Sequence, residues 1–158
     1  MATSTLIQKL DRAADPLVSG TVGSTSETSD RAQSEWFRTT GAVAIGDWVA
    51  LDTTQSTAVD RALFVTSAAN VALGNALVVG VATSSTTSVG GLVKVVVAGF
   101  CPSAKVVAGV AAAGVPLVVV ASAPSAEAQV AANIAPACGV SLAASAAGVA
   151  PVWVIKQF

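Results

Sequence analysis

Apolar and polar residues alternate with a period of two in the clearest segment of this chain. In residues 92–98 (LVKVVVA) three valines fall on one face, while Lys94 falls on the other. That alternation indicates a half-buried antiparallel strand. Residues 76–83 (ALVVGVAT) precede it across a polar loop that ends in two glycines. The two segments together predict a β-hairpin.

Several other short segments have the composition of strands and are bounded by Gly, Pro or polar turns. They are residues 46–52, 63–66, 117–120, 139–142 and 152–155. Val is β-branched and favours strands, while Gly and Pro recur every few residues and stop helices from growing. The pattern predicts a mainly β fold, a small β-barrel or sandwich of short antiparallel strands. In the Ala-rich residues 111–113 and 126–132 we expect short helical turns instead.

A weak internal repeat runs through the β-rich part of the chain. The matched segments are residues 80–96 with 139–155 and residues 46–51 with 114–119. They predict two related halves, 46–100 and 114–158, each a strand followed by a hairpin, within one β-rich domain over residues 41–158. Sequence so rich in Val, Ala and Gly also produces such echoes by chance, so both interpretations stand.

Residues 1–40 differ in character and predict an N-terminal arm. A short helix is expected at about residues 5–14, where the apolar residues recur at helical spacing and a Ser or Thr can cap the start. Its apolar stripe consists of Leu6, Ile7 and Leu10. Residues 18–35 are rich in Ser, Thr and Gly without periodicity, which is typical of a linker or an extended arm.

Trp36 and Phe37 lie at the junction of the arm and the β-rich domain. Aromatic residues are scarce in this chain, so one interpretation is that the pair closes one end of the core. The other is that the pair anchors a neighbouring subunit, because Trp is enriched at binding hot spots.

The overall composition excludes several classes of partner. Hydrophobic residues make up 53% of the chain and charged residues 11%, where about 25% charged is usual. Eight basic and nine acidic residues give a net charge of −1, which provides no field for nucleic acid or anionic lipid. A chain this poor in charge has few means of remaining a dispersed monomer. We therefore expect other subunits to cover part of its surface.

The side chains also offer little chemistry. The sequence contains no His, so the Ser-His-Asp arrangement and the commonest metal ligand are absent. Cys101 and Cys138 lack a Cys-x-x-Cys spacing and are interpreted as small buried hydrophobes, with a single bridge left open. We expect no metal site, no cofactor and no enzymatic activity.

Asp47 and Asp52 form the best carboxylate pair. Five positions apart on a strand, they face opposite sides and cannot serve one glycosidic bond together. We interpret them as solvated strand ends. An enzyme that uses Asp47, Asp52 or Asp60 is the least favoured alternative.

Two uncharged stretches, residues 106–126 and 128–155, are long enough to span a bilayer. Prolines interrupt both of them, their Ala and Val content is weakly hydrophobic, and no basic cluster flanks them. The N-terminus also lacks the basic and apolar segments of a signal peptide. The sequence therefore favours a protein outside the membrane, and a small holin-like protein is a less favoured alternative.

Three segments resemble the decoration (cement or head-stabilisation) proteins that coat tailed-bacteriophage capsids. They are Gly-Asp-Trp-Val-Ala-Leu-Asp at 46–52, Ala-Leu-Val-Val-Gly-Val-Ala at 76–82 and Gly-Leu-Val-Lys-Val-Val-Val-Ala-Gly at 91–99. The similarity covers about residues 41–100. It implies a β-barrel or β-tulip domain, commonly a homotrimer at capsid three-fold axes, with an N-terminal arm on the capsid lattice. The Ala-rich C-terminal half and the long arm depart from the simplest members, which leaves the symmetry and the docking site open.

The resemblance implies a structural virion protein that stabilises a phage capsid by bridging capsomers on its outer surface. Its partners would be the major capsid protein and further copies of itself, without nucleic acid or membrane. Its location would be the capsid surface of the virion. The residues expected to contact the capsid or a subunit are Leu6, Ile7, Leu10, Trp36 and Phe37. Another phage structural module, from a tail, fibre or baseplate, is the main alternative.

Overall fold

The structure, a computed structural model, describes residues 32–67, 76–120, 123–130 and 135–157. Its elements in chain order are β1 (Ala32–Thr39), β2 (Trp48–Leu51), α3 (Ala58–Leu63), β3 (Phe64–Ser67), β4 (Val78–Ala82), β5 (Leu92–Lys105), β6 (Pro116–Val119), β7 (Ala126–Ala128), β8 (Gly139–Ser141) and β9 (Val149–Val154). The predicted helix at residues 5–14, with Leu6, Ile7 and Leu10, lies outside the described residues.

Five strands form a closed barrel in the order β1-β3-β2-β4-β5, because β5 also pairs with β1. Closure leaves these strands without an open sheet edge. The interior is filled by small branched or short side chains. They are Val43, Val49, Val65, Val79, Ala82, Val93, Val95 and Val97. The predicted mainly β fold with a small barrel is therefore confirmed. The predicted hairpin is formed by β4 and β5, with Lys94 exposed on the outer side.

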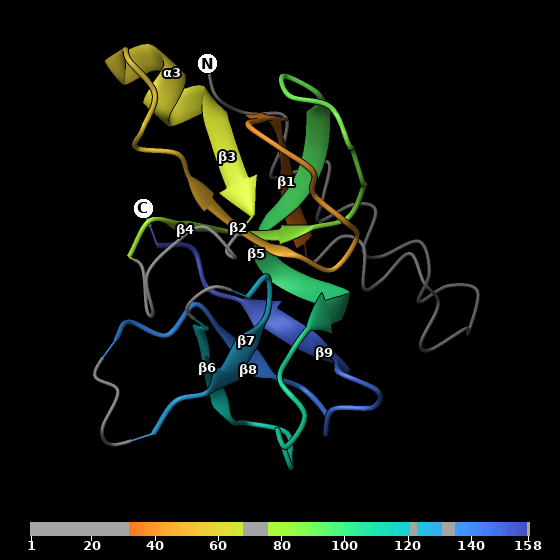
Figure 1. The fold of residues 1–158 in the computed structure, drawn as a ribbon. Helices are drawn as coiled ribbons and strands as arrows, with labels where there is room; N and C mark the ends of the chain where they lie inside the picture. Colours follow the sequence, from red (N-terminus) through yellow and green to blue (C-terminus); the bar gives the residue numbers. More distant parts are fainter. Residues whose placement is uncertain (1–31, 68–75, 121–122, 131–134, 158) are drawn as a thin grey trace, which may run out of the picture.

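The remaining strands continue from the same long strand, β5, which has 14 residues. Its last part pairs with β9, and the sheet continues through β8 and β6 to β7. A parallel bridge between Val106 and Ala126 then returns β7 to the segment that follows β5. We call the unit from β1 to residue 98 the first barrel and the unit from residue 99 to β9 the second barrel. Figure 1 shows β5 running from the first barrel, in the upper half of the view, into the second barrel, where β6 to β9 lie in the lower half.

The two barrels share one pattern of backbone hydrogen bonds. In the first barrel the amide of Thr39 donates to the carbonyl of Gly91 (2.9 Å), Thr40 to Val65 (3.1 Å) and Gly46 to Ala82 (2.8 Å). The corresponding bonds of the second barrel, in the same order, are Val106 to Gly148 (2.9 Å), Val107 to Ala126 (2.7 Å) and Gly114 to Ser141 (2.7 Å). The registers also match: Leu51–Val65 with Val119–Ala126, Val81–Val96 with Val140–Trp153, and Phe37–Val93 with Ala104–Ala150. Each unit therefore repeats one topology, and the last part of β5 plays the part of β1 in the second barrel.

Trp48 joins the two barrels. It projects from β2 of the first barrel, is fully buried, and donates its indole N–H to the carbonyl of Lys105 at 3.0 Å. A Cβ atom at Gly139 would lie 2.9 Å from the tip of its ring, so only glycine lets the ring lie there without a shift. The ring belongs to the apolar cluster that fills the second barrel. The two barrels thus share one strand, and the Trp48 ring of the first barrel enters the core of the second, while the valine core of the first barrel is a separate cluster.

Three local predictions were wrong. Residues 32–39 were assigned to the arm but form β1, because their backbone completes the ladders of both β3 and β5. Within residues 126–132, where short helical turns were expected, Ala126–Ala128 form β7, since pairing with β6 outweighs the helix propensity of Ala, and residues 131–132 lie outside the described residues. Residues 111–113 lie in a bend and turn. The helix α3 was not predicted, although Thr57 caps it by accepting the Asp60 amide at 3.1 Å.

Candidate interaction surfaces

Asp47 is buried, so the prediction that it is a solvated strand end is wrong. Its side chain is 6% exposed and accepts the ammonium of Lys105 at 2.6 Å and the Ala44 amide at 2.8 Å. The Lys105 side chain remains 38% exposed and covers the carboxylate. Because Lys105 ends β5 and Asp47 precedes β2, the ion pair fixes the turn before β2 to the strand that enters the second barrel. Its role is structural.

Asp52 is also buried and is also not a solvated strand end. It accepts the hydroxyl and amide of Thr54 at 2.6 and 2.9 Å and the side-chain amide of Gln55 at 3.0 Å. Burial alone would raise the pKa of Asp52, but these hydrogen bonds, with one from Thr40, outweigh it and lower the pKa below its ordinary value. A carboxylate whose charged form is stabilised in this way is a poor general acid.

Both cysteines are free and buried. The Cys138 thiol donates to the Leu117 carbonyl at 3.3 Å, and burial raises its pKa to about 12. Burial also raises the pKa of Cys101. Because the thiolate is the reactive form, neither group can act as a nucleophile at neutral pH. Their interpretation as small buried hydrophobes is confirmed, and no bridge joins them.

Trp36 and Phe37 lie on opposite sides of β1. Phe37 packs against the valine core of the first barrel, whereas Trp36 is 62% exposed. The proposal that Trp36 closes the core is therefore wrong, and for Phe37 it holds in part because the ring is half-buried.

Trp36 stands in a small exposed surface that crosses two strands. In the β1–β5 ladder Trp36 is opposite Lys94, and Arg38 is opposite Leu92. Residues opposite each other in a ladder share one side of the sheet. Leu92 is 58% exposed, and both cationic residues are exposed. We call these four residues the Trp36 face. It combines two apolar and two cationic side chains on the outside of a closed barrel.

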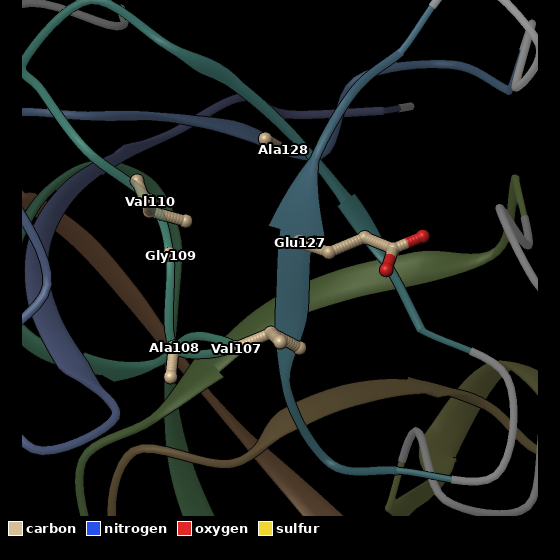
Figure 2. Close-up of a pocket in the computed structure, with 6 residues that line it drawn as sticks. All are labelled: Val107, Ala108, Gly109, Val110, Glu127 and Ala128. Carbon is tan, nitrogen blue, oxygen red and sulfur yellow. The ribbon is translucent and has the colours of Figure 1, made fainter.

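A shallow hollow of about 190 Å³ lies beside β7 (Figure 2). Its walls are formed by Glu127, Ala128 and residues 107–110. In Figure 2 the Glu127 carboxylate extends away from the 108–110 segment, so the hollow itself is lined mainly by small apolar groups. It offers no pair of acid and base groups.

A second hollow, of about 150 Å³, lies at one end of the first barrel. Its apolar part consists of Phe37, Val79 and Val97. Glu35 and Lys156 stand at its rim with 3.8 Å between carboxylate and ammonium, each side chain nearly half exposed. An exposed pair of this kind contributes little to stability. We call this hollow the first-barrel pocket.

The outer side of the second barrel was missed by sequence reasoning. Trp153 is 41% exposed between two buried valines of β9. The Val-Trp-Val alternation was a usable signal, because it places Trp153 opposite to the valines on a strand. Lys94 and Leu92 of the Trp36 face were also missed, since only the ladder brings them beside Trp36.

No family model and no curated protein sequence matches this chain. Among the described residues no group of three or more His, Cys, Asp or Glu side chains could hold a metal ion. Within the same part of the chain, no helix has the length and apolar character needed to cross a membrane.

Proposed function

We propose that this chain is a structural virion protein that binds the outer surface of a tailed-phage capsid and stabilises it by bridging capsomers. It acts as a homotrimer on the capsid surface, and its partner is the major capsid protein. No catalytic step, nucleic acid or membrane enters this role. The resemblance of residues 41–100 to decoration proteins is the source of the proposal.

The Trp36 face carries the proposal on the structural side. A closed barrel with an exposed Trp beside two cationic side chains, Lys94 across the ladder and Arg38 on the same strand, is suited to docking, because Trp and Arg dominate binding hot spots. Of the carboxylates that sequence analysis considered for catalysis, Asp47 and Asp52 hold turns, and Asp60 accepts the Thr57 hydroxyl at 2.7 Å at the start of α3. Buried area and not reactivity is what a cement protein needs.

The proposed role also includes the N-terminal arm that the sequence predicts. Trp36 lies four residues after Ala32, where β1 begins. In the proposed role Leu6, Ile7 and Leu10 bind the capsid lattice together with Trp36. Several arms on one trimer then raise the avidity through their effective concentration.

Binding of Trp36→Ala to undecorated heads of the phage that encodes this chain tests the proposal. Loss of a hot-spot Trp costs about 2 kcal/mol or more, so the affinity should fall at least about 30-fold. Val59→Ala on α3 is the matched control, because Val59 is 67% exposed and does not belong to the β1–β5 ladder that forms the Trp36 face. Full head occupancy by Trp36→Ala in cryo-electron microscopy would exclude the Trp36 face as the capsid contact.

A tail, fibre or baseplate module would share the composition and the fold. Co-sedimentation of the purified protein with isolated heads and with isolated tails separates the two proposals. Binding to tails alone would replace the capsid partner with a tail partner. A helical circular dichroism spectrum in detergent would instead favour the holin-like alternative.

A further inference from the structure

The two barrels contribute different surfaces to the contact between them. A row of side chains on the outer side of the first barrel packs against one end of the second barrel. The row consists of Trp48, Val81 and Val96, which are 0%, 0% and 4% exposed. The receiving end consists of Cys101, Ala104, Cys138 and Val154, all buried in the same apolar cluster. The row of one barrel is therefore covered by the end of the other.

The same row exists on the second barrel, where the described residues do not cover it. In the first barrel the row follows the ladder from Trp48 through Val81 to Val96. The equivalent ladder of the second barrel runs from Pro116 through Val140 to Trp153, and Phe100 of β5, which is opposite Trp153, extends it by one strand. Pro116 is exposed, Val140 and Phe100 are half-buried, and Trp153 is 41% exposed. We call these four residues the Trp153 row. It is apolar throughout and crosses four adjacent strands.

The same receiving end exists on the first barrel, where the described residues leave a hollow of about 150 Å³ that Lys156 and Gln157 also line. The strand registers give the equivalent residues of the two ends. They are Glu35 with Cys101, Phe37 with Ala104, Val79 with Cys138, and Val97 with Val154. These four first-barrel residues line the first-barrel pocket. Within the described residues, one chain thus carries a matched contact between its barrels, an uncovered row and a hollow end.

We infer that two copies of this chain associate by placing the Trp153 row of one copy over the first-barrel pocket of the other. The occupant is a second copy, because the chain itself shows this row and this end fitting together in the contact between its two barrels. The inference rests on the proposed function only for the expectation that copies of this chain associate. It adds which surfaces of the two copies meet. The half-exposed Glu35 and Lys156 then form a polar rim around an apolar centre, the arrangement usual at protein interfaces.

The molecular mass in solution tests the contact. Light scattering across a range of concentrations should give a multiple of the 15.4 kDa chain mass for the wild-type protein. Trp153→Glu places a charge in the row and should reduce the mass to that of one chain, with an unchanged β spectrum in circular dichroism. Val59→Glu adds the same charge on α3 and should leave the mass unchanged. A wild-type monomer at every concentration, or a Trp153→Glu variant with the wild-type mass, would overturn the inference.

Cross-linking tests which surfaces meet. Leu142→Cys lies beside the row and is 42% exposed, while Glu35→Cys lies at the pocket rim. The two variants, carrying different tags, are mixed and treated with a short bismaleimide. A link between the two variants is expected, and links within either variant alone should be much weaker. A Leu142→Cys variant that links to itself as efficiently as to Glu35→Cys would show row against row and sink the inference.

These outcomes separate the inference from the proposed function. An oligomer that depends on Trp153 but does not bind heads would refute the capsid role and leave the contact between copies intact. A monomer that still binds heads through the Trp36 face would do the reverse.

Discussion

Asp52 accepts three hydrogen bonds from Thr54 and Gln55, and these bonds hold the turn that leads from β2 toward α3. The carboxylate is 7% exposed, so its charge is retained only because the bonds replace water. In the sequence the same residue is a candidate acid beside Asp47. The structure separates the two: each is bound to its own local partners.

Asp52→Ala should lower the free energy of unfolding by about 1–2 kcal/mol at pH 7, because the donors of Thr54 and Gln55 lose their acceptor. The pKa of Asp52 is lower in the folded state than its ordinary value of 3.8. Its charge therefore stabilises the fold above about pH 4, and this contribution is lost as the pH falls through the folded-state pKa. In urea unfolding, the difference in the free energy of unfolding between wild type and Asp52→Ala should be smaller at pH 3 than at pH 7.

Asp52→Asn keeps one acceptor oxygen and should therefore lose less stability than Asp52→Ala. A difference that is the same at both pH values would contradict the assignment.

The buried thiols provide a second residue-scale prediction. Because burial raises the pKa of Cys138 to about 12 and also raises that of Cys101, both should react with Ellman's reagent at pH 8 far more slowly in buffer than in urea. The absorbance of the released thionitrobenzoate gives both rates. One equivalent released rapidly in buffer would show that one thiol is accessible in the native state.

Trp36 illustrates the limit of prediction for single residues. Its neighbour Phe37 points inward and Trp36 outward, and the alternation of a strand requires that they differ. Which of the two is buried depends on how β1 closes the barrel against β5. That pairing joins residues far apart in the chain, and no local pattern encodes it.

At the scale of elements, strands with β-branched alternation were predictable and strands without it were not. β4 and β5 were found because valines dominate them, while β1 (AQSEWFRT) and β7 (AEA) have polar or helix-favouring compositions. Both missed strands exist because other strands offer them a ladder. For α3 a local signal was present, since Thr57 and Asp60 have the spacing of a capping motif.

The β4–β5 ladder depends on one close approach. A Cβ atom at Gly80 would lie 1.9 Å from the Val96 carbonyl oxygen, and backbone cannot yield as a flexible side chain can. Gly80→Ala should therefore force the two strands apart and lower the free energy of unfolding by about 3 kcal/mol or more. Gly41→Ala is the matched control, because nothing lies within 4 Å of its Cβ position. Urea unfolding of both variants checks the difference, and equal stabilities would show that β4 and β5 are less tightly paired than described.

At the scale of the whole molecule, the repeat explains why the echo in the sequence covers only part of each unit. Residues 46–51 and 114–119 kept similar sequences, whereas β1 and the last part of β5 occupy the same place in the two barrels with unrelated side chains. The equivalence of these two strands is visible only in their hydrogen bonds. It is this hidden part of the repeat that closes each barrel.

The shared strand β5 and the burial of Trp48 in the second barrel also predict how the chain unfolds. β5 belongs to both barrels, and Trp48 of the first barrel is buried in the cluster that fills the second. Neither barrel can lose its strands without exposing apolar surface of the other, so the two should unfold in a single transition. At a fixed protein concentration, circular dichroism and tryptophan fluorescence should give coincident urea curves, because the buried Trp48 ring becomes exposed to water when either barrel opens. Trp48→Ala removes the ring that joins them, should cost about 3–5 kcal/mol, and should separate the barrels into two transitions followed by circular dichroism. A wild-type protein with two resolved transitions would show that each barrel is stable alone and that β5 couples them only weakly.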